Sequence, residues 1–301
     1  MALLAAEAAL LSENDRQKGI IEELIKEDDF FNLLPFVKTE GLSYLYTREK
    51  TNAAGAWFDA YEDLEESTST VENVSTTLKR IGGQVDMDNF IIETKSDVYD
   101  QVAVQLGQKA KGMGDQFRQE VVTGDVAVNP KGFDGLRKLV VPAQTLTIAA
   151  NGAPIDFGAL DELLDSVKKS DGKVLMMRKE VWRQIRSLNR AMGGNTAETV
   201  MPANFGWAMK MYDGIPVLIN DFLPVNEVQG TDTTTTSVYA MRLNEVDGLH
   251  GIYGGIGSVG FKLSKLGLLE KKDVTRFRVI WYAGMALKAT HSLSRLKGVA
   301  I

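Results

Sequence analysis

The longest regular pattern of apolar positions runs from Thr94 to Asp125. Thr94 or Ser96 is positioned to cap the start of a helix, and Gly124 predicts a left-handed stop at its end. At about 1.5 Å per residue such a helix is roughly 40 Å long, enough to cross a medium-sized domain. Apolar residues recur every three or four positions on one face, here called the apolar stripe: Val98, Val102, Leu106, Ala110, Met113, Phe117 and Val121.

Three glycines interrupt the interior of this predicted helix, at Gly107, Gly112 and Gly114. A glycine in a helix interior costs about 1 kcal/mol relative to alanine. The three together predict a locally weak middle, and they are hinge candidates in a rod that can bend.

A second long pattern lies near the end of the chain, over residues 274–290, and it alternates with the period of a β-strand. The predicted strand is far longer than the usual five or six residues, so we expect it to run beside the long helix. One face carries Phe277, Val279, Trp281, Ala283, Met285 and Leu287, and the other carries Arg276, Arg278, Ile280, Tyr282 and Lys288.

Residues 36–92 show alternation and loops, which predict a long hairpin-like excursion. Leu42, Tyr44 and Tyr46 alternate with polar neighbours, and residues 71–81 form the returning strand. The segment between the strands combines aromatic and acidic residues, notably Trp57, Phe58, Tyr61, Glu62, Asp63, Glu65 and Glu66. It is either a solvated loop with aromatics folded under it or an arm that docks on a partner, because loops this long are often mobile or functional.

The remaining segments predict a helical arm over residues 1–34 and an α/β block after the long helix. The arm carries a thin apolar stripe that needs a partner surface. In the block, Asp156 is expected to cap a helix, Lys173 to Met177 to form a strand, and Thr233 to Thr236 to form a turn or flexible tip.

Composition narrows the class of protein. The chain has 301 residues, 44% of them hydrophobic and 25% charged, which is typical of a globular protein. A net charge of -6 argues against binding nucleic acid over the whole surface, although a local basic face remains open. The absence of cysteine excludes disulfides and thiolate chemistry, and the opening MALLAAEAALL is too short and lacks the basic leader for secretion or membrane anchoring.

The sequence predicts no catalytic, cofactor-binding or metal site, and hence no enzyme. The fragment GIGSVG has the spacing of a dinucleotide-binding loop, but the hydrophobic strand and helix that should flank it are missing, so we expect a glycine-rich turn. His250 is expected in a loop and His291 at a strand end, and they form no metal-type pair.

The order of several motifs resembles that of the major capsid proteins of tailed bacteriophages, which have the Hong Kong 97 type of capsid fold. These motifs are the arm leading into IIEELIKEDDFFNLLPF, then LKRIGG, VVTGD, GFDGL, DGIPVLIND and RFRVIWYAGMALKAT. The resemblance covers nearly the whole chain and rests on the order and spacing of the motifs together.

The resemblance implies an α+β fold with four parts. These are an N-terminal arm (1–35), an extended loop (36–82), a peripheral domain (83–140 and 250–287) that contains a spine helix (96–123), and an axial domain (141–249 and 288–301).

It also implies assembly as a function. Subunits would form pentamers and hexamers of a shell that encloses double-stranded genomic DNA, located in the virion after assembly in the host cytoplasm. The resemblance implies a portal protein and a shell expansion step, and it leaves a decoration protein open. Because the region before the arm is short for a cleaved scaffold, we expect a separate scaffolding protein. We match no crosslinking set around Lys50.

Within that resemblance, the aromatic residues of the hairpin segment gain a neighbouring subunit to pack on. We hypothesise that the acids beside them meet a basic stretch across a subunit boundary, which would provide register more than affinity. That stretch comprises Lys262, Lys265, Lys271, Lys272, Arg276 and Arg278.

Two other functions remain open. An encapsulin, a bacterial compartment of the same fold that encloses a cargo enzyme, is the alternative closest in shape. A nucleotide-binding enzyme built on GIGSVG is the distant alternative.

Overall fold

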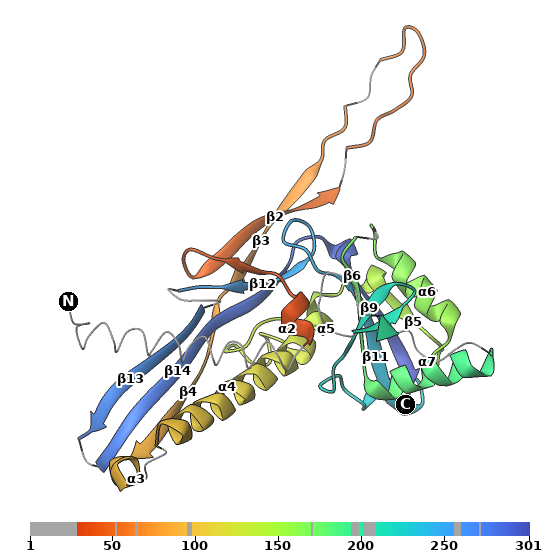
Figure 1. The fold of residues 1–301 in the computed structure, drawn as a ribbon. Coiled ribbons are helices and arrows are strands. Elements are labelled where there is room, and N and C mark those ends of the chain that lie inside the picture. Colours follow the sequence, from red (N-terminus) through yellow and green to blue (C-terminus); the bar gives the residue numbers. More distant parts are fainter. Residues whose placement is uncertain are drawn as a thin grey trace.

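The computed structural model describes residues 29–51, 53–63, 66–94, 98–169, 171–193, 199–200, 209–255, 260–270 and 272–301. The predicted arm up to residue 28, the capping candidate Ser96, Glu65 and Lys271 lie outside these residues. A long sheet backed by a helix lies beside an α/β block, and a narrow hairpin projects away from both (Figure 1).

The long sheet has five strands, and β14 is its central member. Strand β14 pairs with β4 from Val274↔Asp88 to Ala283↔Lys79, and with β13 and β12. Its strands are β1 (Phe36–Lys38), β4 (Lys79–Asp88), β12 (Leu249–Tyr253), β13 (Phe261–Leu269) and β14 (Lys272–Leu287).

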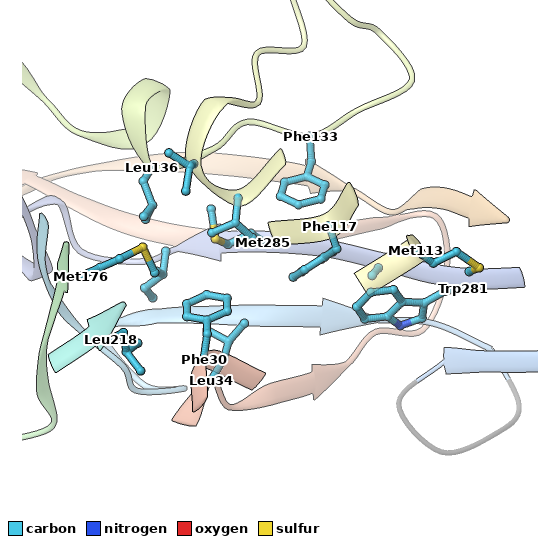
Figure 2. Close-up of a cluster of buried hydrophobic side chains, with 14 of the residues drawn as sticks. Phe30, Leu34, Met113, Phe117, Phe133, Leu136, Met176, Leu218, Trp281 and Met285 are labelled. Carbon is cyan, nitrogen blue, oxygen red and sulfur yellow. The ribbon is translucent and has the colours of Figure 1, made fainter. Parts of the chain in front are cut away.

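The predicted long helix is α4 (Val98–Thr123), which lies along this sheet after the short α3 (Asn89–Thr94). Its apolar stripe is buried from Val102 to Val121, as the sequence predicts. The ring centroids of Phe117 and Trp281 are 4.6 Å apart, and Figure 2 shows both side chains in the buried cluster. The packing of the long strand on the long helix is therefore confirmed.

The predicted left-handed stop at Gly124 is wrong, because this glycine does not have a positive φ. Its role is close approach of backbone segments. A methyl group at Gly124 would lie 2.2 Å from the carbonyl oxygen of Phe133 and 2.5 Å from that of Glu120. The amide of Gly135 donates a hydrogen bond of 2.9 Å to the Gly124 carbonyl, so the chain turns tightly against the end of α4.

The α/β block contains an eight-stranded sheet in the order β5-β15-β11-β6-β9-β8-β7, with β10 paired to β11. Helices α6 (Phe157–Ser166) and α7 (Lys179–Ala191) pack on the sheet face that carries Leu175, Val238 and Leu296. The strands are β5 (Thr145–Thr147), β6 (Lys173–Met177), β7 (Thr199–Val200), β8 (Met209–Tyr212), β9 (Ile215–Ile219), β10 (Glu227–Gln229), β11 (Asp232–Arg242) and β15 (Leu293–Ala300).

Two expectations for this block need correction. Thr233 to Thr236 is no flexible tip, because it belongs to β11, and Thr235 and Thr236 are fully buried by pairing with β15. Asp156 does occupy the N-cap position of α6, but its side chain makes no capping hydrogen bond. The strand expected at Lys173 to Met177 is confirmed as β6.

The two sheets share one continuous core. Met176, Leu218 and Tyr239 of the block belong to the same buried cluster as Phe117 and Trp281. The described residues also form the short helices α2 (Asp29–Leu33), α5 (Leu136–Leu139), η1 (Pro142–Gln144) and η3 (Thr290–Ser292). The block is thus held against the long sheet by apolar packing.

Replacing Trp281 with alanine should lower the free energy of unfolding of the unassembled protein by about 3–5 kcal/mol, because it empties the space between α4 and β14. Denaturant unfolding followed by circular dichroism measures this change. Trp57→Ala is the matched control: Trp57 is fully exposed, so its loss should change stability by no more than about 0.5 kcal/mol. Equal effects of the two substitutions would contradict the assigned packing.

Candidate inter-subunit contact site

The projecting hairpin is formed by β2 (Ser43–Thr51) and β3 (Thr70–Thr77), which pair with each other as a separate two-stranded sheet. Large apolar side chains on it are exposed, with Leu45 at 71% and Val71 at 63% of their full accessibility. An isolated two-stranded sheet is marginally stable in water, and apolar residues on its faces favour contact with another surface.

The segment between the strands, described at 53–63 and 66–69, is called the tip. Trp57 and Tyr61 are fully exposed there, and Phe58 is 60% exposed. The tip has some local order: the amide of Asp59 donates a 2.9 Å hydrogen bond to the Glu62 carboxylate. The structure thus leaves Trp57 and Tyr61 fully exposed and Phe58 largely exposed, and Asp63 and Glu66 are exposed beside them.

The base of the hairpin is anchored to the long sheet. Tyr46 packs in a small buried cluster with Ile252 and Ala286. The Arg48 guanidinium donates hydrogen bonds to the carbonyl oxygens of Leu287, at 2.7 Å, and Lys288, at 2.9 Å. The hairpin therefore leaves the body from a fixed position.

His250 lies under this base, in strand β12, and it is fully buried. The expectation of a loop position is wrong, because His250 and the adjacent Gly251 pair with β14, and the Phe36 ring packs too closely on Gly251 for a larger side chain there. Its ring packs edge-on against Tyr44, with centroids 5.5 Å apart. Burial lowers the pKa of His250 to about 4, and the positive charge of Lys288 contributes.

The basic stretch predicted in the late strands is partly engaged within the subunit. The guanidinium of Arg276 donates two hydrogen bonds of 2.6 Å to Asp86 of β4. This pairing lowers the pKa of the Asp86 carboxyl and raises that of Arg276. Lys262, Lys265 and Lys272 are exposed, and Arg278 is half-buried.

The three hinge candidates occupy different environments in α4. Gly107 and Gly114 are buried, whereas Gly112 is exposed. Apart from the neighbouring residues and the backbone of the helix itself, a methyl group on Gly112 would have no atom within 4 Å. Gly112 is thus the position where flexibility can be tested without disturbing the packing.

The glycine-rich fragment connects β12 to β13, two strands of the long sheet, and residues 256–259 are outside the described part. Gly255 and Gly260 have φ of +101° and +78°, a conformation that favours glycine. The expectation that no strand precedes the fragment is wrong, because β12 ends at Tyr253, but β13 rather than a helix follows it, so these described elements do not have the strand–loop–helix order of a dinucleotide site. His291 lies in η3, between β14 and β15.

Across the described residues, no group of three or more acidic or histidine side chains could hold a metal ion. In the same part of the chain, no helix is long and apolar enough to cross a membrane.

The structure reveals a basic pocket that the sequence analysis missed. It lies where the hairpin base, the loop after α6 and the end of β14 meet, and its basic lining comprises Arg48, Lys50, Lys168, Lys169, Lys288 and His291. Because these residues come from three distant segments, no local sequence pattern brings them together. Asp247 is the acidic residue of the lining, and it pairs with Lys169 at 2.7 Å and with Arg242. These partners lower its pKa to about 2.

Known structures share this architecture. The SrpI encapsulin of Synechococcus elongatus PCC 7942 is similar with a TM-score of 0.70 and 20% identity, over 90% of this chain and 87% of that chain. The capsid of a native GTA particle gives 0.68 and 14%, over 90% of each chain. A chain of Mycobacterium phage Bobi gives 0.62 and 14%, over 88% of each. A comparison with curated protein sequences finds no match.

The fold is the α+β fold of Hong Kong 97-like capsids, which defines a class of structural shell proteins rather than enzymes. A sequence profile of the phage capsid family matches residues 8–243. The chain belongs to the phage capsid family, and it is a capsid shell protein that assembles with itself. Membership of this family implies a place in the capsid of the virion.

The buried neutral state of His250 predicts a pH dependence of stability. Its ordinary pKa is about 6.5, so between about pH 6.5 and 4 the unfolded chain binds a proton that the folded chain does not. Stability of the unassembled protein should therefore be full above about pH 6.5 and fall as the pH approaches 4.

Denaturant midpoints measured from pH 7 to pH 4.5 test this prediction. His250→Phe should flatten the profile. His291, whose pKa is also lowered by burial and by Lys168, provides the comparison, because His291→Gln should remove a smaller part of the dependence. An unchanged slope in His250→Phe would contradict the assignment.

Proposed function

We propose that this protein is the major capsid protein of a tailed bacteriophage. It forms pentamers and hexamers that tile an icosahedral shell around double-stranded genomic DNA, and it assembles in the host cytoplasm. The observation that carries the proposal is the tip, where the side chains of Trp57 and Tyr61 are fully exposed. Such side chains contribute most when a neighbouring subunit covers them.

The proposal assigns each segment of the chain to a part of the capsid fold. The hairpin, described at 36–51, 53–63 and 66–82, is the extended loop, and residues 1–35 are the N-terminal arm. The long sheet and α4 form the peripheral domain (83–140 and 250–287), and the α/β block forms the axial domain (141–249 and 288–301). The separate sheets support this division, and the shared core keeps the two domains in contact.

The proposed partners follow from the class of shell. A portal protein occupies one vertex, a scaffolding protein directs assembly, and a decoration protein can bind the exterior. DNA is enclosed without sequence readout, because the net charge of -6 leaves only local basic surfaces for phosphate contact. Tip residues and the exposed lysines of β13 and β14 are the proposed contacts between subunits.

An encapsulin-type compartment is the second candidate, and the similarity to the SrpI encapsulin favours it. The two functions share the shell and differ in its contents. A cargo protein inside the shell, rather than packaged DNA, identifies the compartment.

Purified full-length protein should form closed shells or ring-shaped capsomers when examined by negative-stain electron microscopy. Many modest subunit contacts, each of ordinary interface size, sum to a stable shell. A stable monomer at all concentrations would contradict a shell function. Isolation of particles from the source cells, followed by analysis of nucleic acid and protein content, separates the phage shell from the compartment.

We also propose that α4 bends during shell expansion and that its glycines lower the cost of bending. Gly112→Ala should stabilise the helix by about 1 kcal/mol and slow expansion, because the exposed site accepts a methyl group. Particle diameter after an expansion trigger measures the effect. Gln108→Ala, an exposed change in the same helix, is the control, and expansion of Gly112→Ala at the control rate would contradict the hinge.

Substituting all three glycines should hinder expansion further. In that variant, buried methyl groups at Gly107 and Gly114 add a packing effect, so the single Gly112 variant is the cleaner test of flexibility.

A further inference from the structure

We propose that the basic pocket is the docking site for the acidic tip of a second copy of this chain. This inference rests on the proposed shell function and deepens it by assigning the surface that receives the tip. The assigned acceptor differs from the late-strand lysines, which the sequence alone suggested.

The pocket concentrates positive charge in an acidic protein. It has a volume of about 740 Å³, enough for several side chains. Five lysine and arginine side chains line it, whereas Asp247 is its acidic residue and is already paired with Lys169 and Arg242. Lys50 and Lys168 are exposed at this site, so their charges are available to a partner.

The titration of the neighbouring histidines is consistent with a positive potential. The charge of Lys168 is among the causes that lower the pKa of His291, and that of Lys288 is among those that lower the pKa of His250. Burial is the larger cause in both cases. Positive charges that disfavour the protonated form of the His291 and His250 rings also attract a carboxylate.

The tip has the complementary charge and cannot reach its own pocket. Residues 51–69 contain acidic residues and no lysine or arginine. The hairpin carries the tip far from its own base (Figure 1), so the acids and the pocket of one subunit stay apart. In a shell of identical subunits, a neighbour supplies the missing partner.

The pocket also suits the aromatic residues of the tip. Val246 in its lining is 76% exposed and offers an apolar contact. Trp57 or Tyr61 of the tip can pack on this exposed side chain.

The late strands are a weaker acceptor. Arg276 is held by both oxygens of Asp86 in its own subunit, so part of the positive charge there is already neutralised. The lysines of β13 and β14 lie on an extended sheet, whereas those of the basic pocket converge from three segments. Basic side chains that converge on one pocket attract an acidic segment more strongly than the same charges spread along a sheet.

Disulfide trapping tests the docking directly, because the natural chain has no cysteine. We expect shells of the double variant Asp63→Cys with Lys168→Cys to yield a ladder of covalent oligomers after mild oxidation and non-reducing electrophoresis. The matched control is Asp63→Cys with Lys265→Cys, which places the second cysteine on the late strands and should yield no ladder. A ladder in the control and none in the test variant would overturn the proposal.

Charge exchange provides an independent measurement. Lys50→Glu with Lys168→Glu should reduce the assembled fraction about tenfold at low salt, as should Asp63→Lys with Glu66→Lys, and combining the four changes should restore most of it. Circular dichroism confirms that each variant is folded. Rescue of the tip variant by Lys262→Glu with Lys265→Glu would assign the late strands instead.

The outcomes separate the docking from the shell function. If the unaltered protein forms no shells, both proposals fail. If it forms shells but the pocket variants assemble normally and no disulfide forms, only the assignment of the pocket fails.

Discussion

The packing of α4 against β14 is the contact on which the rest of the structure depends. Phe117 and Trp281 lie at its centre, and the apolar stripe of the helix covers one face of the long sheet. Apolar burial of this kind is non-directional, but the register of β14 with β4 makes it specific. Because β4 joins the hairpin to α3 and α4, this layer also determines where the hairpin leaves the body.

Charged side chains stabilise local geometry within the subunit and are the proposed contacts for its neighbours. Acidic and basic groups that pair within the subunit, such as Asp86 with Arg276 and Asp247 with Arg242, stabilise local geometry. The exposed acids of the tip and the exposed Lys50 and Lys168 of the basic pocket carry opposite charges. Exposed charges gain little alone in water, but many repeated contacts can set the register of identical subunits.

The fold of the subunit and the material that the shell encloses are determined by different features of the protein. A phage capsid and an encapsulin share the fold, and structures of both kinds resemble this chain at 20% identity or less. At this identity the fold persists because it depends on apolar periodicity and strand pairing, which many sequences satisfy. What the shell encloses depends on its inner surface and on its partners, which shape alone does not specify.

The periodicity of apolar residues in the sequence by itself determined the long helix and the long strand. It also determined their contact, because the apolar stripe of the helix and the apolar face of the strand are both buried when they pack together. It likewise identified Trp57 and Tyr61 as side chains without an obvious core. Only the tertiary structure decided the role of Gly124, the burial of Thr235 and Thr236, and the position of His250, because each depends on a backbone segment distant in sequence. The basic pocket belongs to the same class: Lys50, Lys168 and Lys288 are far apart along the chain, and only folding brings their charges together.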